Sequence, residues 1–319
     1  MYEITEVVKF KHLTIDEYLM DWLNGKYYNI FPEFDKNKHT VSLLGHPEAS
    51  KVNQYLIAML HVPREDTDPL PSGLFVFKCP DYHSHYLEKI EIRDETFLET
   101  EQTNRLITDV ESFFKSSDKY KQAKLHHKRG ALLFGPQGSG KSVATNRLLL
   151  KMKDKDIVGV IVPSNVYDLD VLKKVQEAVG ERPFVIIFEE LTERLKEDRS
   201  SILSFLDGQF STKNTYFIAT TNYPEDLPAN LIDRPGRFDL LLEYGNPTQE
   251  QIHDFVLQTT SYDLNDEELV LLKSFSWAYI REVVAQYHIT SKSIKDIHHQ
   301  MKSTRQKYSE TFKGGFGLK

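Results

Sequence analysis

The sequence predicts an α/β fold in which helices cover both faces of a parallel sheet. Short apolar segments alternate with helical ones through the middle of the chain, and this alternation is typical of a parallel sheet. A glycine-rich loop joins the first of these strands to a helix, and after Pro247 only helical patterns remain. The expected strands lie at residues 131–134, 157–162, 184–188, 216–219 and 240–244.

Three domains are expected along the chain. Residues 1–100 form a separate mixed α/β domain, residues 101–246 the large α/β domain, and residues 247–319 a small helical domain with a basic tail. In the helical domain, Asn265 and Glu268 match the capping box that begins a helix. The N-terminal domain combines helical and strand patterns, with helices near 15–23 and 49–61 and strands at 74–77 and 89–92.

The N-terminal domain carries one metal-ligand pattern. Cys79, His83 and His85 place three ligand types within one short segment. A tetrahedral site needs a fourth ligand, and the spacing matches no common zinc module. We therefore interpret these residues as ordinary loop residues and keep a metal site as the alternative.

Composition and charge exclude several classes of protein. The chain has 319 residues and a formal net charge of −7, so it is not a polycation that coats nucleic acid unaided. Cys79 is the single cysteine, which excludes an intrachain disulfide. The start of the chain lacks the apolar region of a signal peptide, and no window approaches the roughly 18 apolar residues that span a bilayer. We expect a cytoplasmic protein with no membrane segment.

The strongest chemical signal is the glycine-rich loop, which matches the pattern G-x-x-x-x-G-K-[ST] between a strand and a helix. In such a loop the backbone N–H groups turn inward and, with the N-terminus of the next helix, favour a phosphate. The lysine bridges the β- and γ-phosphates, and the hydroxyl that follows it ligates Mg²⁺. The candidate residues for binding ATP and Mg²⁺ are Gly135, Pro136, Gln137, Gly138, Ser139, Gly140, Lys141 and Ser142.

Two further strands end in polar side chains. The strand at 184–188 leads to Glu189 and Glu190, and ligands of α/β sheets bind at the carboxyl ends of strands. We expect the first acid to hold the Mg²⁺ shell and the second to orient and deprotonate the attacking water. The strand at 216–219 leads to Asn222, which is placed to hydrogen-bond the γ-phosphate or its water. The alternatives are a solvated acidic loop and an ordinary turn asparagine.

Arg234 and Arg237 flank a Pro-Gly turn. A rigid turn that carries two guanidinium groups is suited to reach the phosphate of a neighbouring subunit. Such an arginine finger is worth about 10³–10⁵ in rate. Taken alone, the pair favours a surface salt bridge instead.

Together these segments resemble the AAA family of ATPases over residues 104–285. The resemblance implies a P-loop AAA module with a helical lid, hydrolysis of ATP with Mg²⁺, and a homo-oligomeric ring such as a hexamer. It also implies roles for the residues above: Lys141 and Ser142 in the phosphate-binding loop, Glu189 and Glu190 as the second acidic motif, Asn222 as the first sensor, and Arg234 and Arg237 as fingers acting in trans. Within the family the chain resembles the clade of the mitochondrial translocase for the Rieske iron–sulfur protein, on residues 106–113, 128–136, 202–208 and 275–279.

The chain departs from the family pattern in several places. Glu189 replaces the usual Asp and is one methylene longer, so the metal shell must shift or use a bridging water; we expect activity to survive. The stretch 228–234 is longer than in most relatives, which leaves open which arginine is the main finger. Ala278 matches the second sensor position in the lid, with Arg281 as a speculative helper.

The segment between Pro163 and Pro183 is short. Peptide-threading relatives carry an aromatic pore loop there, but Tyr167 lacks the following glycine and is interpreted as packing at a helix start. The shortness again resembles the Rieske translocase clade, which does not thread an extended chain, although that translocase has a membrane anchor.

Two hypotheses about function follow from the sequence. The first is an ATP-driven ring that remodels, translocates or assembles a macromolecule, with protein favoured over nucleic acid, held by residues 1–100. The second is a nucleotide-dependent scaffold or loader with slow turnover, for example on DNA, supported only by the basic run at 292–319. For that run we favour the solvated face of a terminal helix over a nucleic-acid contact. Residues 126–129 form another basic patch, for which we favour a structural or nucleotide contact over DNA.

Overall fold

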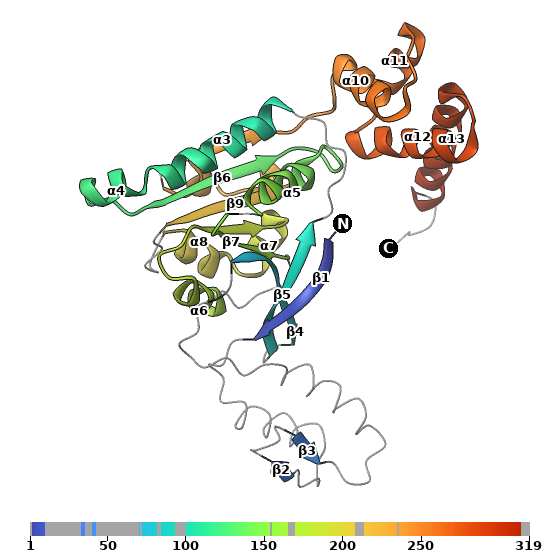
Figure 1. Cartoon of the computed structure of the whole chain (residues 1–319). Helices are drawn as coiled ribbons and strands as arrows, with labels where there is room; N and C mark the ends of the chain where they lie inside the picture. Colours follow the sequence, from blue (N-terminus) through green and yellow to red (C-terminus); the bar gives the residue numbers. More distant parts are fainter. Residues whose placement is uncertain are drawn as a thin grey trace.

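The computed structural model describes most of the central and C-terminal parts of the chain and short stretches of the N-terminal part (Figure 1). The described residues are 2–9, 33–35, 40–42, 70, 72–81, 84–92, 100–153, 155–164, 170–207, 214–234 and 236–313. His83, Tyr167 and the helices predicted near 15–23 and 49–61 lie outside them, as do the side chains of Cys79 and His85. Within the described part, no three His, Cys, Asp or Glu side chains gather as metal ligands would.

One large sheet holds eight of the described strands, in the order β1-β5-β4-β7-β8-β9-β6-β10. The strands from β4 to β10 in that order run parallel. At one edge β5 is antiparallel to both of its neighbours, β4 and β1. All residues of β7, β8 and β9 are buried, as expected for a parallel sheet covered on both faces. The bounds are Tyr2–Lys9 (β1), Gly73–Asp81 (β4), Ser84–Ile92 (β5), Lys128–Phe134 (β6), Val158–Val162 (β7), Phe184–Phe188 (β8), Thr215–Thr221 (β9) and Leu240–Glu243 (β10).

Strands from the N-terminal part belong to this same sheet. β4 pairs in parallel with β7, with Leu74 beside Gly159, and β5 and β1 continue outward from β4. The two strands predicted at 74–77 and 89–92 are therefore present, but they extend the large sheet and do not form a separate one. A second sheet consists of β2 (Glu33–Asp35) and β3 (Thr40–Ser42). The domain boundary at residue 100 remains a prediction.

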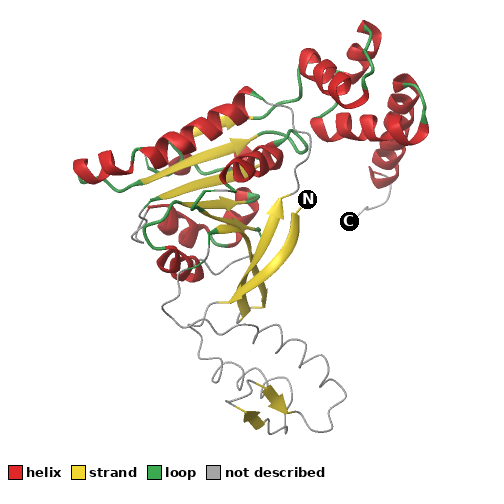
Figure 2. Cartoon of the chain, in the orientation of Figure 1, coloured by secondary structure: helices red, strands yellow, loops and turns green. Residues whose placement is uncertain are grey.

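Helices cover both faces of the sheet, as the β-α alternation predicts (Figure 2). On one face α3 (Glu101–Lys115) and α5 (Lys141–Met152) bury Leu106 and Leu148 in one apolar core. On the other, α6 (Asp170–Val179), α7 (Leu191–Glu197) and α8 (Arg199–Asp207) bury Leu172, Leu191 and Phe205 in a second core. Three short elements complete this part: α4 (Ser117–Ala123), η1 (Pro224–Asp226) and α9 (Ala229–Ile232).

The C-terminal part is a helical unit with its own core, as predicted. It consists of α10 (Gln249–Thr260), α11 (Asp266–Leu272), α12 (Trp277–Thr290) and α13 (Ile294–Lys313). Side chains such as Ile252, Ile280 and Ile297 form its apolar core. The predicted capping box of Asn265 and Glu268 begins α11, since each side chain accepts the other's backbone N–H. We call this unit the lid.

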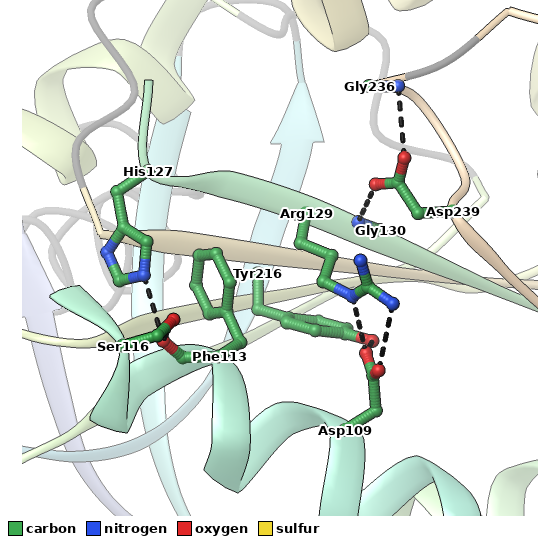
Figure 3. A network of polar contacts seen from close by, with 9 residues as sticks. All are labelled: Asp109, Phe113, Ser116, His127, Arg129, Gly130, Tyr216, Gly236 and Asp239. Atoms are coloured by element: carbon green, nitrogen blue, oxygen red, sulfur yellow. Dashed lines mark hydrogen bonds and ion pairs between the residues drawn. The ribbon is translucent and has the colours of Figure 1, made fainter. Parts of the chain in front are cut away.

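A partly buried polar network ties α3 to the sheet. Arg129 of β6 donates two hydrogen bonds to Asp109 of α3, with Nε 2.7 Å from Oδ2 and Nη2 2.9 Å from Oδ1. The hydroxyl of Tyr216 on β9 donates to the same carboxylate at 2.6 Å. Figure 3 shows both side chains reaching Asp109. Burial raises the pKa of Tyr216, so its hydroxyl stays protonated and able to donate to Asp109.

His127 has a structural place beside this network (Figure 3). Its ring stacks on Phe113 with centroids 3.9 Å apart, and its Nε2 lies 2.9 Å from the Phe113 carbonyl oxygen. Burial lowers its pKa. His127 precedes β6, at the end of that strand away from the glycine-rich loop, so for this residue a structural contact replaces the nucleotide contact considered for 126–129.

We expect Tyr216→Phe to lower the free energy of unfolding by about 1.5–3 kcal/mol, because it removes a hydrogen bond to a carboxylate. Urea denaturation followed by circular dichroism measures the change. Tyr223→Phe is the matched control, since Tyr223 is 49% exposed, and should shift stability by no more than about 0.5 kcal/mol. Equal stability of Tyr216→Phe and wild type would show that the Tyr216 hydroxyl contributes nothing to stability.

Candidate functional site

The glycine-rich loop follows β6 and leads into α5. Gly135, Gly138 and Gly140 have φ values of 142°, 77° and 104°, a region of backbone conformation that residues other than glycine rarely adopt. At Gly135 the chain also lacks room, because a Cβ there would lie 2.0 Å from the Tyr244 carbonyl oxygen. The loop therefore needs glycine both for its turns and for its close contact with the end of β10.

Lys141 points back into this loop. Its ammonium donates to the carbonyl oxygens of Gly135 and Pro136 at 2.7 and 3.0 Å, and to the Ser139 hydroxyl at 3.4 Å. The residue is 7% exposed, and this burial lowers its pKa to about 8, although the nearby Glu190 carboxylate acts in the opposite direction. The cation is thus held inside the loop, beside the exposed Ser142 at the start of α5.

The two acids lie directly after β8. The Glu189 backbone N–H donates to Val162 at the end of β7 at 3.2 Å, and the Glu190 N–H donates to the Thr220 hydroxyl of β9 at 3.2 Å. Burial and the neighbouring Glu190 carboxylate raise the pKa of Glu189. Glu190 has a φ of 51°, in the left-handed region, and its side chain is exposed. The two carboxyl groups therefore have different surroundings, since Glu189 is partly buried and Glu190 is exposed.

Asn222 follows β9 and lies between both features. The Thr221 carbonyl oxygen accepts the Gly135 N–H at 3.3 Å, which joins the end of β9 to the glycine-rich loop. The Thr221 hydroxyl lies 2.5 Å from that of Thr192 on α7, and it accepts the Tyr223 N–H at 3.0 Å. Asn222 is therefore fixed on both sides, beside the loop and beside the helix that Glu190 begins.

The lid contacts the glycine-rich loop through the start of α12. The Ala278 N–H donates to the Gly138 carbonyl oxygen at 3.1 Å. A Cβ on Gly138 would lie 2.9 Å from the Ser276 hydroxyl and 3.0 Å from the Ala278 Cβ, so glycine allows the lid to approach. The Ala278 methyl group brings no charge to the loop, and the hydrogen bond from Ala278 to Gly138 comes from its backbone N–H.

The arginine turn lies at the other end of β6. The Asp239 backbone N–H donates to the Gly130 carbonyl oxygen at 2.8 Å, and the Asp239 carboxylate accepts the N–H groups of Gly130 and Gly236 (Figure 3). Gly130 precedes Gly135 by five residues of strand, which corresponds to roughly 16 Å. The structure thus brings the loop, the acids and Asn222 together but does not bring the two arginines to them.

The two arginines differ in their surroundings. Arg237 is 3% exposed, and its guanidinium donates to both carboxylate oxygens of Asp207, at 2.7 and 2.8 Å, and to the Asn230 carbonyl oxygen at 2.6 Å. Arg234 is 60% exposed and donates once to Asp207, at 2.9 Å. These cations lower the pKa of Asp207. Arg237 is therefore part of the interior, and Arg234 projects from the surface.

Sequence reasoning missed several residues that support the site. Asp207 lies in the segment 202–208, which contributed to the family resemblance without a role for its acid. Thr220 and Thr221 precede Asn222 and could have been noted as hydroxyl groups at the end of a strand. Arg194, which lies buried in α7, carries no motif that would identify it.

Residues 131–246 match the family model of the ATPase family associated with various cellular activities, AAA. The proteasome-activating nucleotidase of Methanothermobacter thermautotrophicus is 26% identical over 221 residues, 62% of this chain and 51% of that protein. A probable mitochondrial chaperone bcs1 of Schizosaccharomyces pombe is 29% identical over 169 residues, 49% of this chain and 37% of that protein. An AAA-ATPase of Arabidopsis thaliana is 30% identical over 176 residues, 48% of this chain and 34% of that protein.

The chain thus spans between about a third and a half of the length of these relatives. None of the helices in the described ranges has both the length and the apolar character that crossing a bilayer requires. The family match covers the strands and loops that carry the glycine-rich loop, the acids, Asn222 and the arginine turn. The chain therefore contains an ATPase domain of the AAA family, and its homologues include mitochondrial chaperones of the bcs1 type.

Proposed function

We propose that the protein hydrolyses Mg·ATP as a ring and uses the reaction to remodel, translocate or assemble a macromolecular partner. The observation that carries the proposal is the meeting of three groups at the carboxyl ends of β6, β8 and β9. These groups are the glycine-rich loop, the acid pair and Asn222. Ligands of parallel sheets bind at such an edge.

The loop fits the phosphates of a nucleotide. Its three glycines have no side chains that would keep a phosphate from the backbone N–H groups, and the N-terminus of α5 adds partial positive charge. Lys141, already buried in the loop, would pair with the phosphates, and Ser142 with Glu189 would hold Mg²⁺. Bound Mg²⁺ supplies charge neutralisation at the phosphate oxygens.

Glu190 and Asn222 are placed to act on water. Glu190 is the exposed acid of the pair, and its backbone is fixed to Thr220 of the neighbouring strand. Its carboxylate would accept a proton from the attacking water, and Asn222 would hydrogen-bond that water or the γ-phosphate. The burial of Glu189 suits a group that meets a cation instead.

The position of the arginine turn supports action between subunits. β6 separates the turn from its own loop, so neither arginine can reach a phosphate bound in the same chain. Arg234 is exposed and is our candidate for the finger, whereas Arg237 is engaged by Asp207 and would hold the turn in shape. A neighbouring copy would then receive Arg234 at its glycine-rich loop.

A protein partner is favoured by the named relatives. They include a proteasome-activating nucleotidase and a probable mitochondrial chaperone. We propose that this chain likewise acts on a protein, and that the N-terminal residues hold it.

We expect Glu190→Gln to abolish ATP turnover while ATP binding is kept, because the amide cannot accept the proton. Steady-state phosphate release and equilibrium binding measure the two properties. Size-exclusion chromatography with light scattering, with and without ATP, should show the variant as a nucleotide-dependent ring. Glu193→Gln is the control: Glu193 is exposed on α7, where its carboxylate lies 2.8 Å from the Lys196 ammonium. Turnover by Glu190→Gln at the wild-type rate would contradict the assignment.

We expect Arg234→Ala to lower turnover by about 10³-fold or more, since the finger stabilises transition-state charge in trans. Mixed with wild type at increasing ratios, it should depress activity more than in proportion to its share. Arg199→Ala, an exposed change at the start of α8, is the matched control and should leave the activity of the mixtures unchanged. Wild-type turnover by pure Arg234→Ala would contradict the finger role.

We expect ATP affinity to fall above about pH 8, where Lys141 loses its proton. Bound phosphates favour the charged ammonium, so the dissociation constant should rise about tenfold per pH unit above that point. A fluorescent ATP analogue titrated between about pH 7 and pH 9.5 measures it. Lys141→Arg keeps its charge throughout this range and should give a flat profile. A flat wild-type profile would contradict the proposed contact.

A further inference from the structure

Helix α7 is fixed to the ends of three neighbouring strands. The Glu190 N–H, at its start, donates to Thr220 at the end of β9. The Thr192 hydroxyl lies beside that of Thr221 and donates to the Tyr223 carbonyl oxygen at 3.2 Å, also after β9. The third attachment comes from Arg194 and reaches the other two strands.

Arg194 is 2% exposed and spans from α7 to the ends of β7 and β8. Its Nη2 donates to the Pro163 carbonyl oxygen and lies 3.4 Å from that of Val162. The guanidinium carbon lies 5.5 Å from the centroid of the Phe188 ring, within reach of a cation–π contact. Phe188 is the residue before Glu189, and Val162 also accepts the Glu189 N–H. Arg194 therefore contacts Phe188, which precedes Glu189 in the chain, and Val162, which accepts the Glu189 N–H.

Stability alone does not explain an arginine at this position. Burying a guanidinium costs several kcal/mol in desolvation, and apolar residues of similar volume often replace buried charges without loss. The arginine instead holds α7 in a defined orientation against the strand ends, because its planar guanidinium donates to carbonyl oxygens at defined angles. Glu190 meanwhile holds a left-handed backbone, with a φ of 51°, which persists only where the surroundings fix it.

We propose that Arg194 is a positioning residue for Glu190. It fixes the first turns of α7 against β7 and β8, as the threonines fix them against β9, and so sets the direction of the Glu190 carboxylate. This inference rests on the proposed function, in which Glu190 activates the attacking water. Arg194 touches neither the nucleotide nor the water and acts through the helix.

The test compares Arg194→Met, Arg194→Lys and wild type. Methionine is long and apolar but donates no hydrogen bond; we expect kcat to fall about 10- to 100-fold, because small misplacements of a catalytic group cost rates of that order. The dissociation constant for ATP should change by less than about twofold and the thermal midpoint should be retained. Lysine keeps a donor and should restore part of kcat. Lys196→Met removes an exposed cation from the same helix and should leave kcat unchanged.

Two outcomes would overturn the proposal. Wild-type kcat in Arg194→Met is one, and a parallel loss of ATP affinity and thermal midpoint, which marks a purely structural role, is the other. If Arg194→Met does not fold, Arg194→Gln decides in the same way, by a fall in kcat at unchanged affinity or by none. Glu190→Gln separates the two levels: if that variant turns over ATP, the proposed function fails, and if it is inactive while Arg194→Met is active, only the role of Arg194 fails.

Discussion

The parallel pairing of β8, β9 and β6 is the constraint on which the site depends. Phe188 lies beside Ala219, and Phe134 lies beside Thr221, so the three strands end at the same edge of the sheet. Each strand is followed at once by a polar segment: the acid pair, Asn222 and the glycine-rich loop. Backbone hydrogen bonds, and not contacts among the polar side chains, therefore bring these groups together. The buried apolar residues of the strands hold the register, because a slip by one residue would exchange the side chains that fill the two cores.

The same strand direction keeps the arginines away from the glycine-rich loop of their own chain. β6 begins beside the arginine turn and ends at the loop, so the length of one strand separates them. Two arginines on one short turn repel each other, and the Asp207 carboxylate reduces this repulsion because both guanidinium groups donate to it. It neutralises Arg237 with two hydrogen bonds and holds Arg234 with one, which leaves the second guanidinium largely exposed. In the proposed function, a subunit built in this way offers Arg234 to a neighbour and receives the same residue from another copy.

The sequence predicted the parts of this arrangement that depend on local patterns. The glycine-rich loop, the acids after β8 and Asn222 after β9 follow strands whose apolar runs are visible in the sequence, and the lid shows its capping box at Asn265. Partners distant in the chain were not predictable in this way. The burial of Arg237 depends on Asp207, thirty residues earlier, and the attachment of β4 to β7 depends on pairing that no local pattern records. Arg194 could not be identified because an arginine in a short helix is ordinarily an exposed one.

Electrostatics then explain why such a site would favour the nucleotide and the cation together. Lys141 is charged against the cost of burial, and Glu189 is an acid whose ionisation is opposed by burial and by Glu190. Phosphates alone would stabilise the lysine but repel the acids, whereas a divalent cation alone would do the reverse. Mg·ATP would supply both charges, with Lys141 as the partner of a phosphate and Glu189 as the partner of the metal. Each component would thus lower the cost of placing the other, because burial lowers the pKa of Lys141 and raises that of Glu189.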